Sequence, residues 1–385
     1  MTEQLRVGII GCGNIALNAH APALKSLESA RVVALADPTE ARRRKVQDLL
    51  GLPDSACFAD HRGLLGAGVD YVTLTVPQRF RRPILEGCAR AGVHVLSEKP
   101  MATVPADGQA MIETMRRANL RYGIVHNYLY FPEYVLARQL IASGAVGILR
   151  HVMLNFLGMP DYPGAAEYRP WWRHDPAEAG GGILMDIVHA VYLAEFFLGG
   201  PIRAASAVVD NFDHPGDAVE DFTLVNYTFD TGYASVNMWW GSGPGGLEIS
   251  GTEGRILVYY ENYDTGPFAT LASFTLVNRH GRRDFQPRVE ANLTQNFVRL
   301  HEDFVEAIRS RRDSIAPGEA GLRSLEAVLA AYASATTGRA VSLPLSPDSP
   351  VHQRGVMGLR ELPAWSESPL QKRGVFGLQG TGNRD

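Results

Sequence analysis

Two parts of the chain carry side chains suited to moving a proton at a reacting carbon. Lys99 lies two residues beyond a short apolar stretch, 93–97, and Asp186 and His189 stand near the start of a long one. An imidazole with a carboxylate in reach suits removal of an alcohol proton, and a partly desolvated lysine loses its own proton more readily. We therefore predict that Lys99, Asp186 and His189 are catalytic residues.

The second apolar stretch, residues 183–198, is predicted to form one buried helix, because nearly every residue in it is apolar. Asp186, His189 and Tyr192 would then share a face of that helix. Burying ionisable groups costs free energy unless they are hydrogen-bonded or functional. The alternative is that Asp186 caps a helix started by glycines and that His189 is a satisfied core residue.

The elements that must position Lys99 begin at the start of the chain. Apolar residues 5–10 run into a glycine turn that opens a helix, with glycines at Gly11 and Gly13. The first backbone N–H groups of such a helix, together with its dipole, form a site for a pyrophosphate. A second predicted strand, 31–36, ends at Asp37, about 20 residues further on, where a carboxylate accepts hydrogen bonds from an adenosine ribose.

Residues 1–122 alternate predicted strands and helices, which is typical of a doubly wound parallel sheet. The carboxyl ends of the strands in such a sheet face the ligand crevice. The residues that follow the predicted strands 71–76 and 93–97 are therefore further candidates for binding the cofactor. The alternative for the glycine turn is an ordinary strand–turn–helix without a ligand. The alternative for Glu98 and Lys99 is an ordinary exposed pair at a strand end. The cofactor-binding residues that we predict are Gly11, Gly13, Asn14, Ile15, Asp37, Pro77, Glu98 and Lys99.

These features together resemble the Gfo/Idh/MocA oxidoreductases, the relatives of glucose–fructose oxidoreductase and inositol dehydrogenase. The resemblance rests on the glycine turn, Asp37, the Val-Pro at 76–77, the run 91–100 and the glycine-led helix. It implies a Rossmann domain followed by an α/β domain with a large open sheet. It also implies that Lys99 is catalytic and orients the cofactor.

The chain departs from the family pattern at several positions. Gln78 and Arg81 stand where the family usually has an asparagine and a histidine, and Tyr192 stands where an acid is common. Many members also place the histidine four residues after the aspartate, whereas His189 follows Asp186 by three. Arg81 and its basic neighbours either meet an anionic group or form a solvated basic loop.

The activity that the resemblance implies is hydride transfer between nicotinamide and a secondary alcohol of a sugar, inositol or related cyclic polyol. Asp37 favours NAD, because a carboxylate repels a 2′-phosphate, while the arginines at 42–44 leave NADP open. Two alternatives belong to other classes. One is an NAD-dependent glycosidase acting through transient oxidation, and the other is a non-catalytic nucleotide-sensing member.

Residues 123–345 are predicted to form the second domain, whose alternating stretches indicate a mostly antiparallel sheet. From the resemblance we expect a homodimer or homotetramer that pairs through this sheet. Aromatic and polar side chains near the expected crevice suit a polyol, although ordinary loop packing explains several of them. The substrate-binding candidates are His126, Tyr128, Trp172, Arg173 and Tyr192, with Tyr168, Trp171 and His174 in the same aromatic, basic loop.

The composition of the chain limits the kinds of molecule that we expect it to bind. A net charge of −4 over 385 residues argues against nucleic acid or a membrane surface as a partner, and no apolar stretch approaches a membrane span. The three cysteines are too few and too scattered for a disulfide framework or a zinc site, so we expect no metal. With no secretory signal in view, we expect a cytoplasmic protein.

The last segment, 346–385, is rich in proline, glycine and serine and contains a short repeat, in which residues 349–359 match 368–378. Two copies are too few for a solenoid. One hypothesis is that the apolar tips of the repeat dock on a neighbouring subunit. The alternative is a disordered tail.

Overall fold

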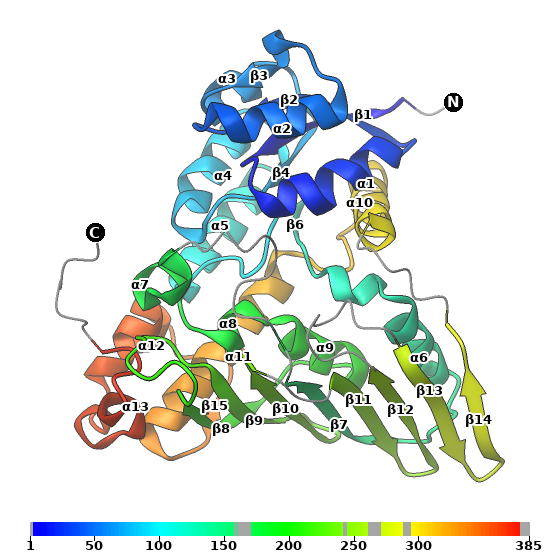
Figure 1. The fold of residues 1–385 in the computed structure, drawn as a ribbon, viewed down its shortest axis with the longest axis vertical. Helices are drawn as coiled ribbons and strands as arrows, with labels where there is room; N and C mark the ends of the chain where they lie inside the picture. The colour runs from blue at the N-terminus through cyan, green and yellow to red at the C-terminus, as the bar shows by residue number, and fades with distance from the viewer. Residues whose placement is uncertain are drawn as a thin grey trace. The chain divides into compact units, whose positions relative to one another are not determined.

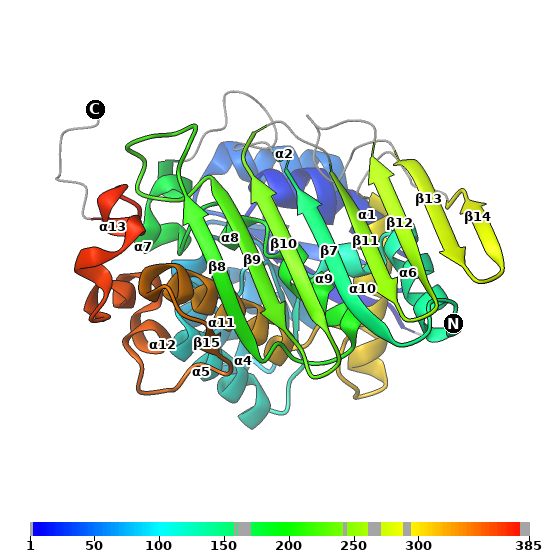
Figure 2. The same cartoon turned by 90° about the horizontal axis from the view of Figure 1, so that it is seen from below.

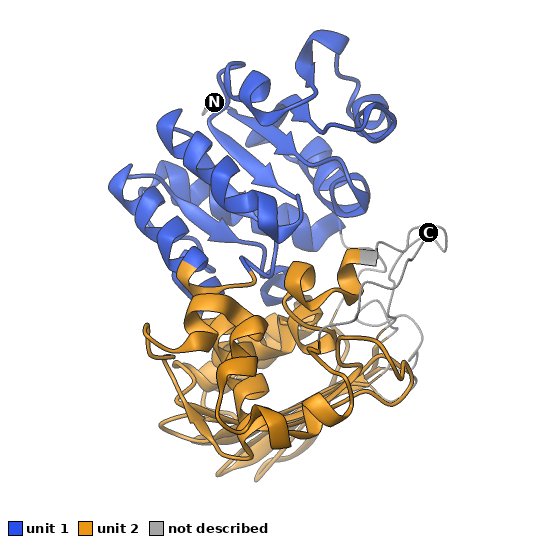
Figure 3. Ribbon diagram, turned by 90° about the vertical axis from the view of Figure 1, so that its left-hand side faces the viewer, with its two compact units in different colours: residues 1–102, 107–130, 292–322 blue, residues 103–106, 131–291, 323–385 orange. Residues whose placement is uncertain are grey.

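The computed structural model describes residues 3–157, 159, 171–241, 245–260, 271–287 and 294–377. The chain divides into two compact units (Figure 3). Unit 1 comprises residues 1–102, 107–130 and 292–322, and unit 2 comprises residues 103–106, 131–291 and 323–385. The units therefore do not follow a single cut at residue 122, because a segment from late in the chain returns to unit 1.

Unit 1 contains a sheet of parallel strands in the order β3-β2-β1-β4-β5-β6, counted over the described residues (Figure 1). The order reverses at β1, which is the arrangement of a doubly wound sheet and confirms the predicted fold class of this part. Its elements are β1 (Leu5–Ile10), η1 (Ala16–His20), α1 (Ala21–Ser26), β2 (Ala30–Ala36), α2 (Glu40–Leu50), η2 (Asp54–Ala56), β3 (Cys57–Phe58), α3 (His61–Leu65), β4 (Tyr71–Leu74), η3 (Gln78–Phe80), α4 (Arg81–Arg90), β5 (His94–Ser97), α5 (Pro105–Arg117), β6 (Tyr122–Ile124), η4 (Asn127–Tyr130) and α10 (Thr294–Arg309).

Helix α10 belongs to the core of unit 1. Its Phe297 and Phe304 are each 1% exposed and share a cluster of buried residues with Val7 and Ile9 of β1. The sequence analysis placed this helix in the second domain, because nothing local to it reveals which sheet its apolar face covers.

Unit 2 is built on a large sheet with the order β14-β13-β12-β11-β7-β10-β9-β8-β15 among the described residues. All neighbouring strands are antiparallel except β7 and β10, so the predicted mostly antiparallel sheet is confirmed. Its elements are α6 (Pro132–Ala142), β7 (Leu149–Phe156), η5 (Trp171–His174), α7 (Pro176–Ala179), α8 (Ile183–Asp186), α9 (His189–Leu198), β8 (Ala204–Asp210), β9 (Phe222–Thr228), β10 (Tyr233–Trp239), β11 (Gly245–Gly251), β12 (Gly254–Tyr260), β13 (Leu271–Asn278), β14 (Gly281–Phe285), α11 (Gly318–Thr337, whose first residues count with unit 1), β15 (Val341–Ser342), α12 (Pro350–Arg354), η7 (Gly355–Glu361), η8 (Trp365–Glu367) and α13 (Pro369–Lys372).

The two faces of this sheet differ. In β7 and β10 buried residues alternate with partly exposed ones, so one face packs on helices such as α9 and α11. Figure 2 shows the strands in front with these helices behind them. The other face carries exposed apolar side chains, among them Val208 and Leu224.

The C-terminal segment packs within unit 2. Val356, Leu359, Val375 and Phe376 of the repeat are at most 2% exposed. For residues 346–377, both hypotheses about this segment are therefore wrong, because its apolar tips are buried in their own chain. Leu378 lies outside the described residues.

Candidate functional site

The predicted cofactor residues of unit 1 follow the carboxyl ends of neighbouring strands. The glycine turn follows β1, Asp37 follows β2, Pro77 comes soon after β4, and Glu98 follows β5. Because these strands are parallel, the four segments lie along one edge of the sheet, at the point where the strand order reverses. This is the edge at which doubly wound folds bind nucleotides.

The glycine turn has the conformation that its sequence predicts. Gly11 has φ +97°, and a Cβ there would lie 2.9 Å from the backbone of Thr75. At Gly13 a Cβ would meet nothing within 4 Å, so the space in front of this residue is open. Asn14 and Ile15 lie in the helical turn just before η1. Backbone N–H groups at a helix start, with open space beside Gly13, fit a dinucleotide pyrophosphate.

The carboxylate of Asp37 braces this turn. Its Oδ2 accepts a hydrogen bond from the backbone N–H of Cys12 at 2.8 Å, and its Oδ1 accepts one from Thr39 N–H at 2.8 Å. Arg43 donates to the carbonyl oxygen of Asp37. A carboxylate offers about four acceptor positions, so Asp37 retains acceptor capacity for a ribose, while a guanidinium lies at the same strand end.

Glu98 fixes the backbone of Lys99 through a buried chain of side chains. Glu98 Oε2 accepts from the N–H of Lys99 at 3.0 Å, and its Oε1 lies 3.1 Å from His20 Nε2. His20 Nδ1 lies 3.0 Å from His301 Nε2, whose Nδ1 lies 3.2 Å from the hydroxyl of Tyr71. None of the four supporting side chains is more than 6% exposed. Lys99 itself is half-buried.

The charges in this chain follow from burial and pairing. Burial alone would raise the pKa of Glu98, but the hydrogen bond and charge of His20 and the charges of Lys99 and Arg81 outweigh it, so the pKa is lowered. Burial, with the charge of His20, holds the pKa of His301 well below its ordinary value. The sequence analysis missed His20, Tyr71 and His301. A histidine within the apolar stretch after the glycine turn was the available signal for His20.

Arg81 is a structural residue of the same edge. Its guanidinium is 4% exposed and donates to the carbonyl oxygens of Val76, Glu98 and Pro100. Both interpretations of this arginine, as a contact for an anionic group and as part of a solvated loop, are therefore wrong, because its guanidinium binds carbonyl oxygens of its own chain. Burial lowers its pKa to about 10, opposed by the charge of Glu98. Arg81 thus ties the segment after β4 to the segment around Lys99.

His126 and Tyr128, predicted to contact substrate, lie just beyond the carboxyl end of β6. They are 2% and 3% exposed. The N–H of His126 donates to Ile124 O at 2.8 Å. Their roles stay predictions.

The predicted single helix over 183–198 is broken in unit 2. Asp186 is the last residue of α8, His189 is the first of α9, and the helices before and after the break are bent by 47°. Ile187 leaves helical geometry, with φ −96° and ψ 40°. The argument that Asp186 and His189 share one helix face is therefore wrong. A uniformly apolar run carries no signal of such a break.

Both residues nevertheless have polar partners in unit 2. Asp186 forms an ion pair with Arg173 Nη2, and His189 Nδ1 lies 2.7 Å from the hydroxyl of Tyr192. His189 and Tyr192 are 5% and 3% exposed. If His189 donates from Nδ1 to this hydroxyl, its Nε2 carries the lone pair of a base. The orientation of His189 by Asp186 stays a prediction.

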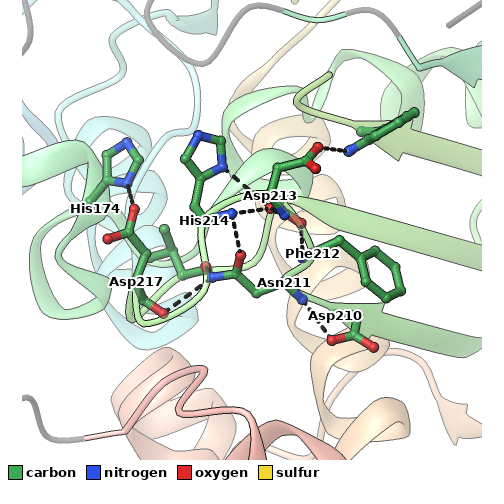
Figure 4. A network of polar contacts seen from close by, with 10 residues as sticks. His174, Asp210, Asn211, Phe212, Asp213, His214 and Asp217 are labelled. Atoms are coloured by element: carbon green, nitrogen blue, oxygen red, sulfur yellow. Dashed lines mark hydrogen bonds and ion pairs between the residues drawn. The ribbon is translucent and has the colours of Figure 1, made fainter. Parts of the chain in front are cut away.

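A further histidine–aspartate pair lies next to Arg173. His174 Nδ1 is 2.7 Å from Asp217 Oδ2 (Figure 4). Asp217 belongs to a loop that Asp221 stabilises, because the carboxylate of Asp221 accepts hydrogen bonds from the N–H groups of Phe212, Asp213 and His214. Sequence reasoning named His174 but missed Asp217. Trp172 is half-buried on η5, whereas Tyr168 and the side chain of Trp171 lie outside the described residues.

No metal site and no membrane helix were found in the part of the chain that the structure describes. That part contains no group of three or more His, Cys, Asp or Glu that could hold a metal ion. Within the same residues, no single helix is long and apolar enough to cross a membrane. One bent pair, Pro176–Asp186 with His189–Leu198, qualifies by length and composition only.

A doubly wound sheet with a glycine turn, a carboxylate and a lysine along one edge is typical of dinucleotide-binding folds. The description "Oxidoreductase family, NAD-binding Rossmann fold" matches residues 5–126, and "GFO/IDH/MocA C-terminal domain" matches residues 134–257. The chain belongs to the Gfo/Idh/MocA family, as the sequence analysis predicted, and is an oxidoreductase with an NAD-binding domain.

Named relatives act on sugars. A dTDP-3,4-didehydro-2,6-dideoxy-alpha-D-glucose 3-reductase of Streptomyces violaceoruber is 30% identical over 54% of this chain and 58% of its own length. A D-xylose 1-dehydrogenase (NADP(+)) of Haloferax volcanii is 27% identical over 87% of this chain and 99% of its own. The structure of aldose-aldose oxidoreductase from Caulobacter crescentus complexed with glycerol matches 89% of this chain and 100% of its own, with a TM-score of 0.77 and 25% identity.

Proposed function

We propose that this protein transfers a hydride between a secondary alcohol carbon of a sugar or related cyclic polyol and the nicotinamide of NAD(P). The observation that carries the proposal is the edge of unit 1, where the glycine turn, Asp37 and the braced Glu98–Lys99 segment follow neighbouring parallel strands. The sugar names of the relatives support the substrate class.

In this proposal the side chains of the chain handle the proton, while a bound nicotinamide supplies or accepts the hydride. Lys99 donates a hydrogen bond to the reacting oxygen or takes its proton, and His189 is the second group that holds the proton. Tyr192 fixes the ring of His189 through the contact at Nδ1. Arg173 holds the carboxylate of Asp186. Asp37 favours NAD over NADP, because its buried carboxylate repels a 2′-phosphate.

A panel of sugars and polyols, assayed with NAD and with NADP for reduced nicotinamide, tests the proposal. We expect turnover of at least one sugar by the wild-type protein. In Lys99→Met, which keeps the length of the side chain but removes the amine, we expect kcat to fall about 10²- to 10⁴-fold, the typical contribution of a positioned acid–base group. The Kd of NADH should change far less than kcat, because Lys99 is only one of the predicted cofactor contacts.

Two other results would overturn the proposal in different ways. Cofactor retained on the purified protein, with no net NADH while a glycoside is cleaved, would make it an NAD-dependent glycosidase. Tight cofactor binding without turnover of any sugar or glycoside would make it a nucleotide-sensing protein.

We also propose that the protein is a cytoplasmic homodimer or homotetramer that pairs through the uncovered face of the large sheet. Val208 is 58% exposed and Leu224 is 40% exposed, and the two residues are direct cross-strand partners on β8 and β9. A second copy of the chain would remove these apolar side chains from water.

A further inference from the structure

The backbone that begins α8 is held by one buried residue, Glu220. Its Oε2 accepts a hydrogen bond from Gly182 N–H at 2.7 Å, its Oε1 accepts one from Leu184 N–H at 3.0 Å, and its carbonyl oxygen accepts one from Ile183 N–H at 3.2 Å. A Cβ at Gly182 would collide with that carbonyl oxygen. Glu220 therefore fixes the turn that leads into Asp186 and His189.

Tyr332 of α11 holds Glu220 in turn. Its hydroxyl donates to Glu220 Oε1 at 2.6 Å, and both side chains are fully buried. Burial raises the pKa of Glu220 to about 7, although the hydrogen bonds from Tyr332, Gly182 and Leu184 lower it. Hydrogen bonds donated to a carboxylate favour its ionised form, so the Tyr332 hydroxyl supports ionised Glu220.

The C-terminal segment reaches this pair through Phe376. Its ring meets that of Tyr332 edge to face, with centroids 4.8 Å apart. Its N–H donates to Ala218 O at 2.7 Å, two residues before Glu220, and its carbonyl oxygen accepts from Arg360 Nε at 2.8 Å. Phe376 has φ +57°, a left-handed conformation that side chains other than glycine rarely adopt. Such a conformation persists only where the surroundings enforce it.

The two copies of the repeat start short helices in this segment. Both copies begin with a Ser-Pro pair, and Ser349 and Ser368 each cap a short helix, accepting from the N–H groups of His352 and Gln371. We propose that residues 349–377 are a positioning element of the catalytic turn. Phe376 and Tyr332 hold Glu220, and Glu220 holds the backbone that carries Asp186 and His189. The catalytic part of this inference rests on the proposed function.

Two variants test the inference with a readout that does not need turnover. Phe376→Ala removes the ring of the segment, and Tyr332→Phe removes only the hydroxyl. We expect both to speed hydrogen–deuterium exchange of peptides covering 181–190 and to lower kcat. In Tyr332→Phe the fall in kcat should be about tenfold, the order expected for losing one hydrogen bond to a charged group. The Kd of NADH should stay unchanged. A chain ending at residue 377 is the matched control and should behave as wild type.

The outcomes separate the inference from the proposed function. Wild-type exchange at 181–190 in folded Tyr332→Phe would overturn the inference, as would a lower melting temperature with wild-type exchange and kcat in Phe376→Ala. Faster exchange in both variants, with no sugar turned over even by the wild type, would support the positioning role and overturn the proposed function. A pH–rate limb that moves to higher pH in Tyr332→Phe would support the role of ionised Glu220.

Discussion

At the scale of single residues, the carboxylate of Glu98 orients the backbone of Lys99. One oxygen receives the N–H of Lys99 and the other faces His20, whose second nitrogen faces His301. A buried carboxylate is costly unless it is hydrogen-bonded. The position of Lys99 therefore depends on residues that lie far from it in the sequence.

His20→Ala tests this dependence through stability. Removing one hydrogen-bond partner of a buried carboxylate costs about 1–3 kcal/mol, so urea denaturation at pH 7 should show a loss of that order. The folded pKa of Glu98 is lowered below the ordinary 4.5. Its contribution to stability is therefore present above about pH 4.5 and is lost as pH falls through the folded pKa.

The same measurement has a control and a contradicting outcome. His280→Ala replaces an exposed histidine and should leave stability unchanged. Wild-type stability of His20→Ala at pH 7, or an unchanged loss of stability in acid, would contradict the role assigned to His20.

The sequence was sufficient to locate those candidate site residues that a local sequence pattern marks. The glycine turn and Asp37 stand at strand ends that apolar runs mark out, so their places on the edge of the sheet followed from pattern alone. The burial of Arg81 could not be predicted, since its acceptors are carbonyl oxygens on the segments after β4 and β5.

At the scale of elements, two glycines that open helices have different requirements. A Cβ at Gly182 would collide with Glu220, whereas one at Gly13 would meet nothing in the protein. We expect Gly182→Ala to lower both the melting temperature and kcat. We expect Gly13→Ala to keep the melting temperature but weaken NADH binding about tenfold or more, because its methyl group would take the space that a pyrophosphate approaches.

Thermal denaturation and NADH titration check this pair of variants. A destabilised Gly13→Ala, or one with wild-type NADH affinity, would contradict the assignment of this turn to the cofactor.

The break between α8 and α9 shows the limit of pattern reasoning at this scale. Buried hydrogen bonds to Glu220 set the start of α8, and residues 183–198 contain no glycine or proline to mark its end.

At the scale of the whole molecule, chain order and compact units do not coincide. Helix α10 joins unit 1, and residues 323–385 return to unit 2. The residue pattern predicted the fold class because alternation and apolar runs are local properties. It could not predict β14 (Gly281–Phe285), because this mostly exposed strand contains a single large apolar residue, Phe285.

The uncovered sheet face gives a prediction about assembly. Val208→Lys with Leu224→Lys places two charges on exposed positions, so the melting temperature of a subunit should change little. Light scattering should show the wild-type oligomer and a smaller species for the double variant. An unchanged mass would contradict pairing through this face.

The proposed function requires that Lys99 and His189 both handle the proton of the reaction. A double-mutant cycle on kcat/KM, using Lys99→Met and His189→Asn with a sugar that the wild type turns over, tests it most directly. Residues that act as a unit give strongly non-additive losses, so we predict that the double variant is about as slow as the slower single variant. Losses that multiply would show that the two side chains act independently and would contradict the account.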